Sequence, residues 1–90
     1  MVLKLSTKDL ASVFVIEAES AGCHALVGSK IRIDIQQVNP MIRRAVIVPT
    51  GGSPGEEKFM GIFGKIRPSV VSIEGDMLLC SLGIMARRSA

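Results

Sequence analysis

The stretch from residue 31 to residue 48, IRIDIQQVNPMIRRAVIV, changes its hydrophobic period partway along and constrains the fold more than any other segment. Ile31, Ile33 and Ile35 alternate with Arg32 and Asp34. Alternation of apolar and polar residues is typical of a strand that is buried on one face. We therefore expect a strand over residues 31–35.

The second half of this stretch has the features of a helix start. Asn39 is a favourable N-cap residue, and Pro40 is tolerated at the first helical position, where its missing N–H costs nothing. Apolar side chains follow at helical spacing at Met41, Ile42, Ala45 and Val46. We expect this helix to end near residue 48, because Pro49 disfavours its continuation.

A strand that runs through Gln36 and Gln37 into a helix would expose backbone N–H groups at the positive end of the helix dipole. Such a junction favours the binding of an anion. Arg43 and Arg44, the only charged residues of the expected helix, add positive charge nearby. The segment therefore predicts an anion site, although Asp34 and the lack of glycines favour a shallow electrostatic face over a tight phosphate cradle.

The N-terminal part of the chain predicts a strand followed by a helix. Residues 2–6 suit a short strand, and Ser6 with Asp9 three residues later forms a capping-box pattern. Residues 13–16 are rich in strand formers. The capping pattern and a suitable C-terminal glycine, Gly22, nevertheless favour a helix through this region.

The C-terminal half predicts a loop and a hairpin. Residues 50–57, TGGSPGEE, form the clearest loop. We expect strands over residues 59–66 and 70–73, a turn at Glu74-Gly75-Asp76 and a return strand over residues 77–85. The resulting order, β-α-β-α-β-β, predicts an α/β two-layer sandwich in which a mixed four-stranded sheet carries two helices on one face.

Composition favours one small domain over residues 1–90 that associates with other copies. Hydrophobic residues make up 48% of the chain and there are nine glycines. This exceeds the apolar content, glycine included, of about 45–50% in average soluble domains. A core of this size does not easily bury so much apolar surface, so we expect a homodimer or higher oligomer.

Localisation is inferred from the cysteines and from the apolar runs. Cys23 and Cys80 lie far apart and form no CxxC motif, which favours two reduced thiols. No signal-peptide pattern opens the chain, and the uncharged run over residues 77–86 is too short to span a bilayer. We expect a cytoplasmic protein with no membrane partner.

No combination of residues predicts an enzyme. His24 is the sole histidine, the GxSxG motif is absent, and Gly51 to Lys58 lacks the ending of a phosphate-binding P-loop. Glu56 and Glu57 adjoin a loop and are expected to be solvated. A zinc site usually needs four ligands, whereas Cys23, His24 and Cys80 are the only histidine and cysteine side chains. We therefore expect no catalytic activity, no metal and no cofactor.

Basic residues supply the remaining candidate site. The net charge of +3 permits an acidic partner without requiring one. Clustered cations suit binding to a phosphate backbone, whereas the near absence of aromatic residues disfavours stacking of single-stranded bases. The candidate residues are Lys4, Lys8, Arg43, Arg44, Lys65 and Arg67. Composition and spacing are equally compatible with solvated faces and salt bridges within an oligomer.

Three segments resemble a known family. Residues 2–8, residues 33–48 with Val38-Asn39 and Arg43, and residues 66–76 resemble parts of the stage V sporulation protein S family. That family is similar in fold to the Alba chromatin proteins, which dimerise and bind nucleic acid. The resemblance implies that Lys4, Lys8 and Arg43 occupy positions of backbone-contacting cations and that the process served is sporulation.

The leading hypothesis is a non-enzymatic, oligomeric protein that binds DNA or RNA electrostatically or regulates a process through such binding. The alternative is a small oligomeric module that binds an anionic ligand or serves only as an assembly subunit. Steep salt dependence of binding to nucleic acid would distinguish the two.

Overall fold

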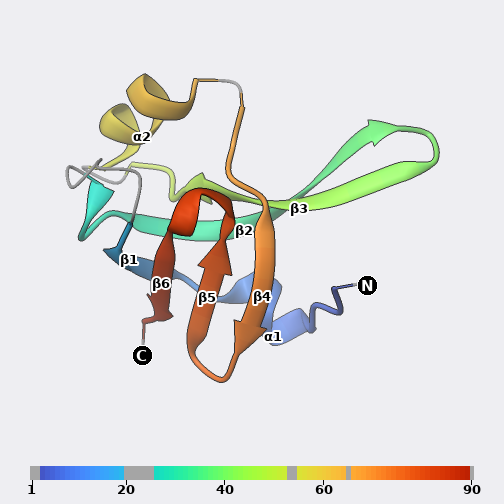
Figure 1. The fold of residues 1–90 in the computed structure, drawn as a ribbon, viewed down its shortest axis with the longest axis horizontal. Coiled ribbons are helices and arrows are strands. Elements are labelled where there is room, and N and C mark those ends of the chain that lie inside the picture. The colour runs from blue at the N-terminus through green and yellow to red at the C-terminus, as the bar shows by residue number, and fades with distance from the viewer. Residues whose placement is uncertain (1–2, 20–25, 53–54, 65, 90) are drawn as a thin grey trace.

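The computed structural model of the protein describes residues 3–19, 26–52, 55–64 and 66–89 (Figure 1). In this part of the chain, six strands form one antiparallel sheet in the order β3-β2-β1-β6-β5-β4. The strands are β1 (Phe14–Ala18), β2 (Lys30–Asn39), β3 (Ile42–Pro49), β4 (Val70–Glu74), β5 (Met77–Cys80) and β6 (Met85–Arg88). The two helices described are short, α1 (Thr7–Ala11) and α2 (Glu56–Phe63). The expected two-layer sandwich with a mixed four-stranded sheet is therefore wrong.

The sheet is curled, so that its two outer strands approach each other. Ser69, just before β4, forms an antiparallel bridge with Val46 of β3. The N–H of Ile47 also donates to the carbonyl of Pro68 at 3.1 Å. The core includes fully buried side chains from β1, β2, β3, α2, β5 and β6, such as Phe14, Ile31, Ile47, Phe59, Leu78 and Ala86. The chain thus builds one core inside a curved sheet instead of a core between a sheet and a helical layer.

The first expected helix begins correctly but is much too long. Ser6 and Asp9 form the predicted capping box, in which each side chain accepts the other residue's backbone N–H at 3.0 Å. The helix ends at Ala11, and β1 follows from Phe14. Phe14 and Ile16 are buried because β1 lies between β2 and β6 in the sheet. The strand propensity of this segment therefore agrees with its tertiary environment, and the prediction of a helix here is wrong.

The second expected helix is also wrong, because Met41 lies in a turn and residues 42–48 belong to β3. The predicted strand over residues 31–35 is confirmed and extends from Lys30 to Asn39. The side chain of Asn39 accepts the N–H of Met41 at 2.8 Å, which makes a turn of the kind that asparagine also favours. The Asn39-Pro40 pair thus reverses the chain, and no helix N-terminus exists beside Gln36 and Gln37 to bind an anion.

The expected strand over residues 59–66 is wrong as well, because α2 occupies most of it. Phe59 is fully buried, and its ring meets that of Phe63 edge to face with centroids 5.0 Å apart. The helix begins at Glu56, within the expected loop of residues 50–57, and ends at Phe63, with Gly64 as its C-cap. Gly64 has a φ of 55°, a left-handed conformation that glycine adopts without strain.

The C-terminal hairpin is partly as expected. The predicted turn lies between β4 and β5, where Glu74 pairs with Met77 and Gly75 takes a φ of 59°. The expected return strand is interrupted by a 3₁₀ turn at Ser81–Gly83, so the chain folds back and β6 pairs with both β5 and β1. The C-terminal arginines are thereby part of the sheet.

Candidate nucleic-acid interface

The β2–β3 hairpin projects beyond the rest of the sheet (Figure 1). β1 pairs with β2 only at Lys30 and Ile31, and the contact of β3 with the segment before β4 is at Val46. Between these points and the tip, the part of the chain that the structure describes contributes no third strand. We call residues 35–45 the arm. Its two strands pair with each other from Ile35 opposite Ala45 outwards.

Polar side chains with hydrogen-bond donors occupy the middle of the arm. Gln36 is opposite Arg44, and Gln37 is opposite Arg43. Successive residues of a strand point to opposite faces, so each face of the arm carries one glutamine and one arginine. Both arginines are exposed, and the ion pairs found within the described ranges do not involve them. No carboxylate occurs in the arm's sequence, IQQVNPMIRRA. The arm therefore presents uncompensated positive charge on both faces.

The tip of the arm is apolar and open to solvent. Met41 is 91% exposed, Val38 57% and Ile42 51%. A β-bulge between Gln37 and Asn39 disturbs the pairing just before the turn. Apolar side chains of this size are unfavourable in water unless something covers them. The tip thus has the character of a contact surface.

A groove lies where the arm leaves the sheet. It has a volume of about 650 Å³ and is lined by residues from the N-terminal segment, α1, both arm strands and the start of β4. Its apolar lining consists of Leu3, Leu5, Leu10, Ile35, Ala45 and Val70. Its polar lining consists of Arg43, Arg44 and Ser69. The two arm arginines therefore also border an apolar concavity.

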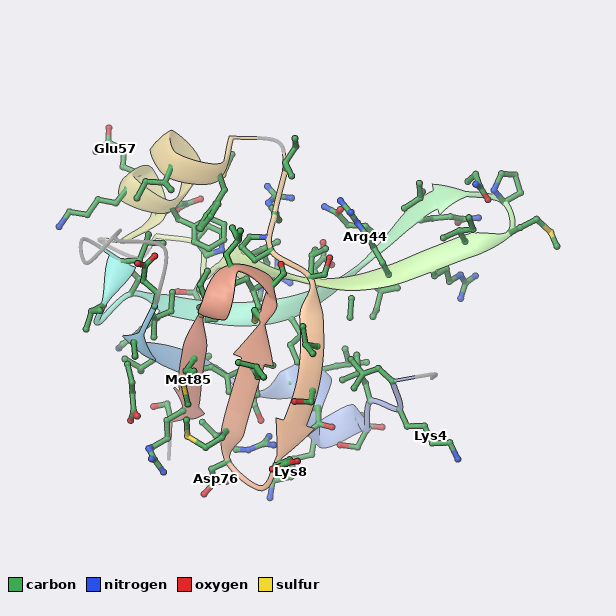
Figure 2. All side chains as sticks on the ribbon, in the orientation of Figure 1. Lys4, Lys8, Arg44, Glu57, Asp76 and Met85 are labelled. Atoms are coloured by element: carbon green, nitrogen blue, oxygen red, sulfur yellow. The ribbon has the colours of Figure 1, made fainter. Side chains whose placement is uncertain are left out.

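The other predicted cations are spread over the molecule. Lys4 and Lys8 are exposed, and Figure 2 shows them on the other side of the arm from Arg44 in this view. Arg67 is half-buried and donates from Nη2 to the sulfur of Met60 at 3.8 Å, which directs it towards α2. Lys65 lies outside the described residues. The structure thus places Arg43 and Arg44 on opposite faces of one arm and does not gather the described candidates on one surface.

Arg88 forms a separate cluster of charged groups at the opposite hairpin. Its guanidinium lies 2.8 Å from Asp9 Oδ1 and 3.4 Å from Asp76 Oδ1. It also donates to Ser12 Oγ and to the carbonyl of Gly75. The hydrogen bond from Arg88, followed by that from the backbone of Ser6, lowers the pKa of Asp9. This arginine joins α1, β6 and the β4–β5 turn, so its charge is already used within the fold.

Catalytic and metal-binding candidates from the sequence find no supporting geometry in the described part of the chain. Cys80 is a free, buried cysteine, and burial raises the pKa of its thiol to about 12. Such a thiol is protonated near neutral pH and is a poor nucleophile. Cys23 and His24 lie outside the described residues. Among the residues described, no group of three or more metal-ligating side chains gathers, and no helix is long and apolar enough to cross a membrane.

In comparisons with known proteins, no protein-family model, no curated protein and no solved structure matches this chain. The resemblance to the stage V sporulation protein S family stays a prediction, and the Alba-like fold that it implied is wrong for this chain. The candidate interface accordingly depends on the geometry of the arm itself.

The sequence identified Arg43 and Arg44 but missed the apolar tip. The helical spacing of Met41 and Ile42 predicts a helix, and Val38 has a part only in the family resemblance, so none of the three is expected at the tip of a hairpin. One signal would have identified them: residues 46–48 are β-branched and follow a turn-forming Asn-Pro pair, a pattern that also fits a hairpin.

Proposed function

We propose that this chain is a small non-enzymatic protein that binds duplex DNA or RNA, with the arm entering a groove of the duplex. The observation that supports this most directly is an arm with uncompensated arginines on both faces and an exposed apolar tip. Arg43 and Arg44 contact phosphates along the groove. Lys4 and Lys8 add longer-range attraction to the polyanion.

The dimensions of the arm suit this role. From Ile35 to Asn39 a strand rises roughly 13 Å at about 3.3 Å per residue. The major groove of B-DNA is about 12 Å wide and 8.5 Å deep and admits a two-stranded ribbon. The arm therefore reaches the floor of a groove while the curved sheet remains outside the duplex.

The tip explains why the proposal goes beyond a simple electrostatic contact. Proteins that bind the minor groove frequently insert proline, methionine or isoleucine between base steps and accompany them with arginine, asparagine or glutamine; the arm has the same residue types, whichever groove it enters. The arm carries Pro40, Met41 and Ile42 at its end and Gln36, Gln37, Arg43 and Arg44 along its stem. Burial of the tip between bases would remove apolar surface from water that the free protein leaves exposed.

Electrophoretic mobility shifts with duplex DNA, duplex RNA and single strands test the proposal. We expect affinity for a duplex to fall steeply between about 50 and 200 mM salt. The double variant Arg43→Gln/Arg44→Gln should make the negative slope of log affinity against log salt shallower by about 2. Each lost phosphate contact reduces the magnitude of this slope by about 1. The matched control Lys30→Gln/Arg32→Gln removes two exposed cations from β2 outside the arm and should have a smaller effect.

The competing function is that of an assembly subunit, favoured by the same exposed tip. Self-association through the arm would cover Val38, Met41 and Ile42 without any nucleic acid. Sedimentation of the wild-type chain and the Met41→Gln variant distinguishes the two. A dimer that is weakened by this change, combined with no binding to duplexes at 50 mM salt, would replace our proposal with the assembly function.

A further inference from the structure

The groove at the base of the arm has the size and the lining of a small-molecule site. Its volume of about 650 Å³ lies within the range of about 300–1,000 Å³ that is usual for ligand pockets. Its floor is continuous with the core, because Leu3, Leu5 and Ala45 pack against the buried cluster. Leu10 and Ile35 remain 42% and 43% exposed at its walls. An apolar ligand would therefore cover surface that the protein alone leaves in contact with water.

Charge at this groove is of one sign. Arg43 and Arg44 line it, and none of its lining residues is a carboxylate. Arg43 lies two residue pairs further out than the Ile35–Ala45 pair and therefore on the same face of the arm, which places a guanidinium at the outer end of an apolar wall. Arginine recognises carboxylates through paired hydrogen bonds in a fixed planar geometry. The lining thus matches a molecule with an apolar body and one anionic end.

We infer that the groove binds a free single-chain amphiphile with a carboxylate headgroup, a fatty-acid-like ligand whose chain lies on Leu3, Leu5, Leu10 and Val70. Its carboxylate pairs with Arg43 at the junction of the groove and the arm. Charge complementarity decides the sign of the headgroup, since a cationic amphiphile of the same chain length would place like charge beside two arginines. This inference goes beyond the proposed nucleic-acid binding and does not require it.

Nuclear magnetic resonance titration of the whole chain with decanoate, below its micelle concentration and without nucleic acid, tests the inference. We expect amide shifts concentrated at Leu5, Leu10, Ala45 and Val70. Decyltrimethylammonium, which has the same chain with a cationic head, and acetate, which has the head without the chain, should each bind at least tenfold more weakly. Comparable binding of either probe would overturn the inference.

Arg43→Gln tests the headgroup contact, and Leu10→Gln separates this site from the nucleic-acid interface. Arg43→Gln should weaken decanoate at least tenfold, whereas Arg32→Gln, an exposed arginine on the same hairpin but outside the groove, should leave it unchanged. Leu10→Gln should weaken decanoate and leave duplex binding unchanged, because α1 is not part of the arm. Three results would contradict the inferred ligand site. The first is amide shifts that spread over the arm tip, and the second is an unchanged decanoate affinity in Arg43→Gln. The third is saturable binding of an acidic apolar peptide without binding of decanoate.

Discussion

Two hairpins of this molecule use arginine in opposite ways. The arm, from β2 and β3, carries Arg43 and Arg44 exposed to solvent and outside the ion pairs of the described residues. The β4–β5 hairpin has an acidic turn, and the arginine that approaches it, Arg88, has a side chain only 12% exposed and held by Asp9 and Asp76. The same residue type is therefore a structural link at one hairpin and a solvent-exposed cation at the other.

The difference indicates which arginines of this fold are available to bind a partner. Arg88 donates hydrogen bonds to Asp9 of α1 and to the carbonyl of Gly75 in the turn. Its guanidinium carbon also lies 5.2 Å from the centroid of the Phe14 ring. Removing it should damage the fold. Arg43 and Arg44 are exposed and outside the ion pairs of the described residues, so we expect them to contribute little to the fold and to be available to a partner of opposite charge.

Removing the arm should have the largest effect on binding and little effect on folding. Replacing residues 36–44 by Asn-Gly joins Ile35 to Ala45, a directly opposed pair, through a two-residue hairpin turn. The core residues of β2 and β3, Ile31, Ile33 and Ile47, are unchanged. We expect duplex binding to become undetectable by mobility shift and the cooperative thermal unfolding to persist. Loss of unfolding cooperativity would show that the arm is structural.

Arg88→Ala should be the most destabilising of the arginine substitutions. It removes the guanidinium partner of Asp9, whose side chain is 15% exposed in the intact protein; breaking a fully buried pair typically costs about 3–5 kcal/mol, whereas exposed pairs contribute about 0–1 kcal/mol. Because Asp76 is 68% exposed and can regain water, we expect about 2–3 kcal/mol less stability in urea unfolding.

The neighbouring residue provides the control for this prediction. Arg87 pairs with Glu17 at 2.7 Å, but both side chains are about half exposed. Exposed ion pairs contribute about 0–1 kcal/mol, so Arg87→Ala should change the free energy of unfolding by less than about 1 kcal/mol. Equal losses in the two variants would refute the distinction between a structural and a surface arginine in β6.

A smaller effect should appear in the pH dependence of stability. Hydrogen bonds from Arg88 and from the Ser6 backbone hold the pKa of Asp9 below its value in the unfolded chain. The folded state therefore binds fewer protons, so the contribution of Asp9 is complete above the unfolded pKa of about 3.9 and is lost as the pH falls through the lower folded pKa. In thermal unfolding measured over a range of pH, Asp9→Asn should lose less stability than the wild-type chain as the pH falls below about 3.9. An unchanged acid limb would show that Asp9 does not carry this dependence.

The features that the sequence predicted correctly are those settled within a few residues. The Ser6–Asp9 capping box and the Glu74–Asp76 turn depend on neighbours and are both present. By contrast, residues 13–16 and 41–48 satisfy helical and extended patterns alike, and their pairing with distant strands decides the outcome. Contacts such as that of Asp9 with Arg88, 79 positions apart, have no local signature.

The candidate site shows the same division between local and long-range information. Arg43 and Arg44 were identified because adjacent cations are visible in any sequence. Their expected and observed environments differ, because the sequence predicts them in the first turn of a helix and the structure places them on the stem of an exposed arm. The groove was not predicted, because Leu3, Leu10 and Val70 come together only when the sheet curls.

The smallest expected change in stability, and the sharpest test of the tip, is Met41→Gln. Because Met41 is 91% exposed, a polar side chain of similar length should alter the free energy of unfolding by no more than about 0.5 kcal/mol. If the tip enters between base steps, the wild-type chain should raise the fluorescence of 2-aminopurine in a duplex by unstacking it, and Met41→Gln should reduce that rise. Met85→Gln, a partly exposed methionine of β6 away from the arm, is the matched control (Figure 2). A fluorescence rise that is equal in all three proteins would mean that the arm follows the phosphates without inserting its tip, and only the electrostatic part of the proposed interface would remain.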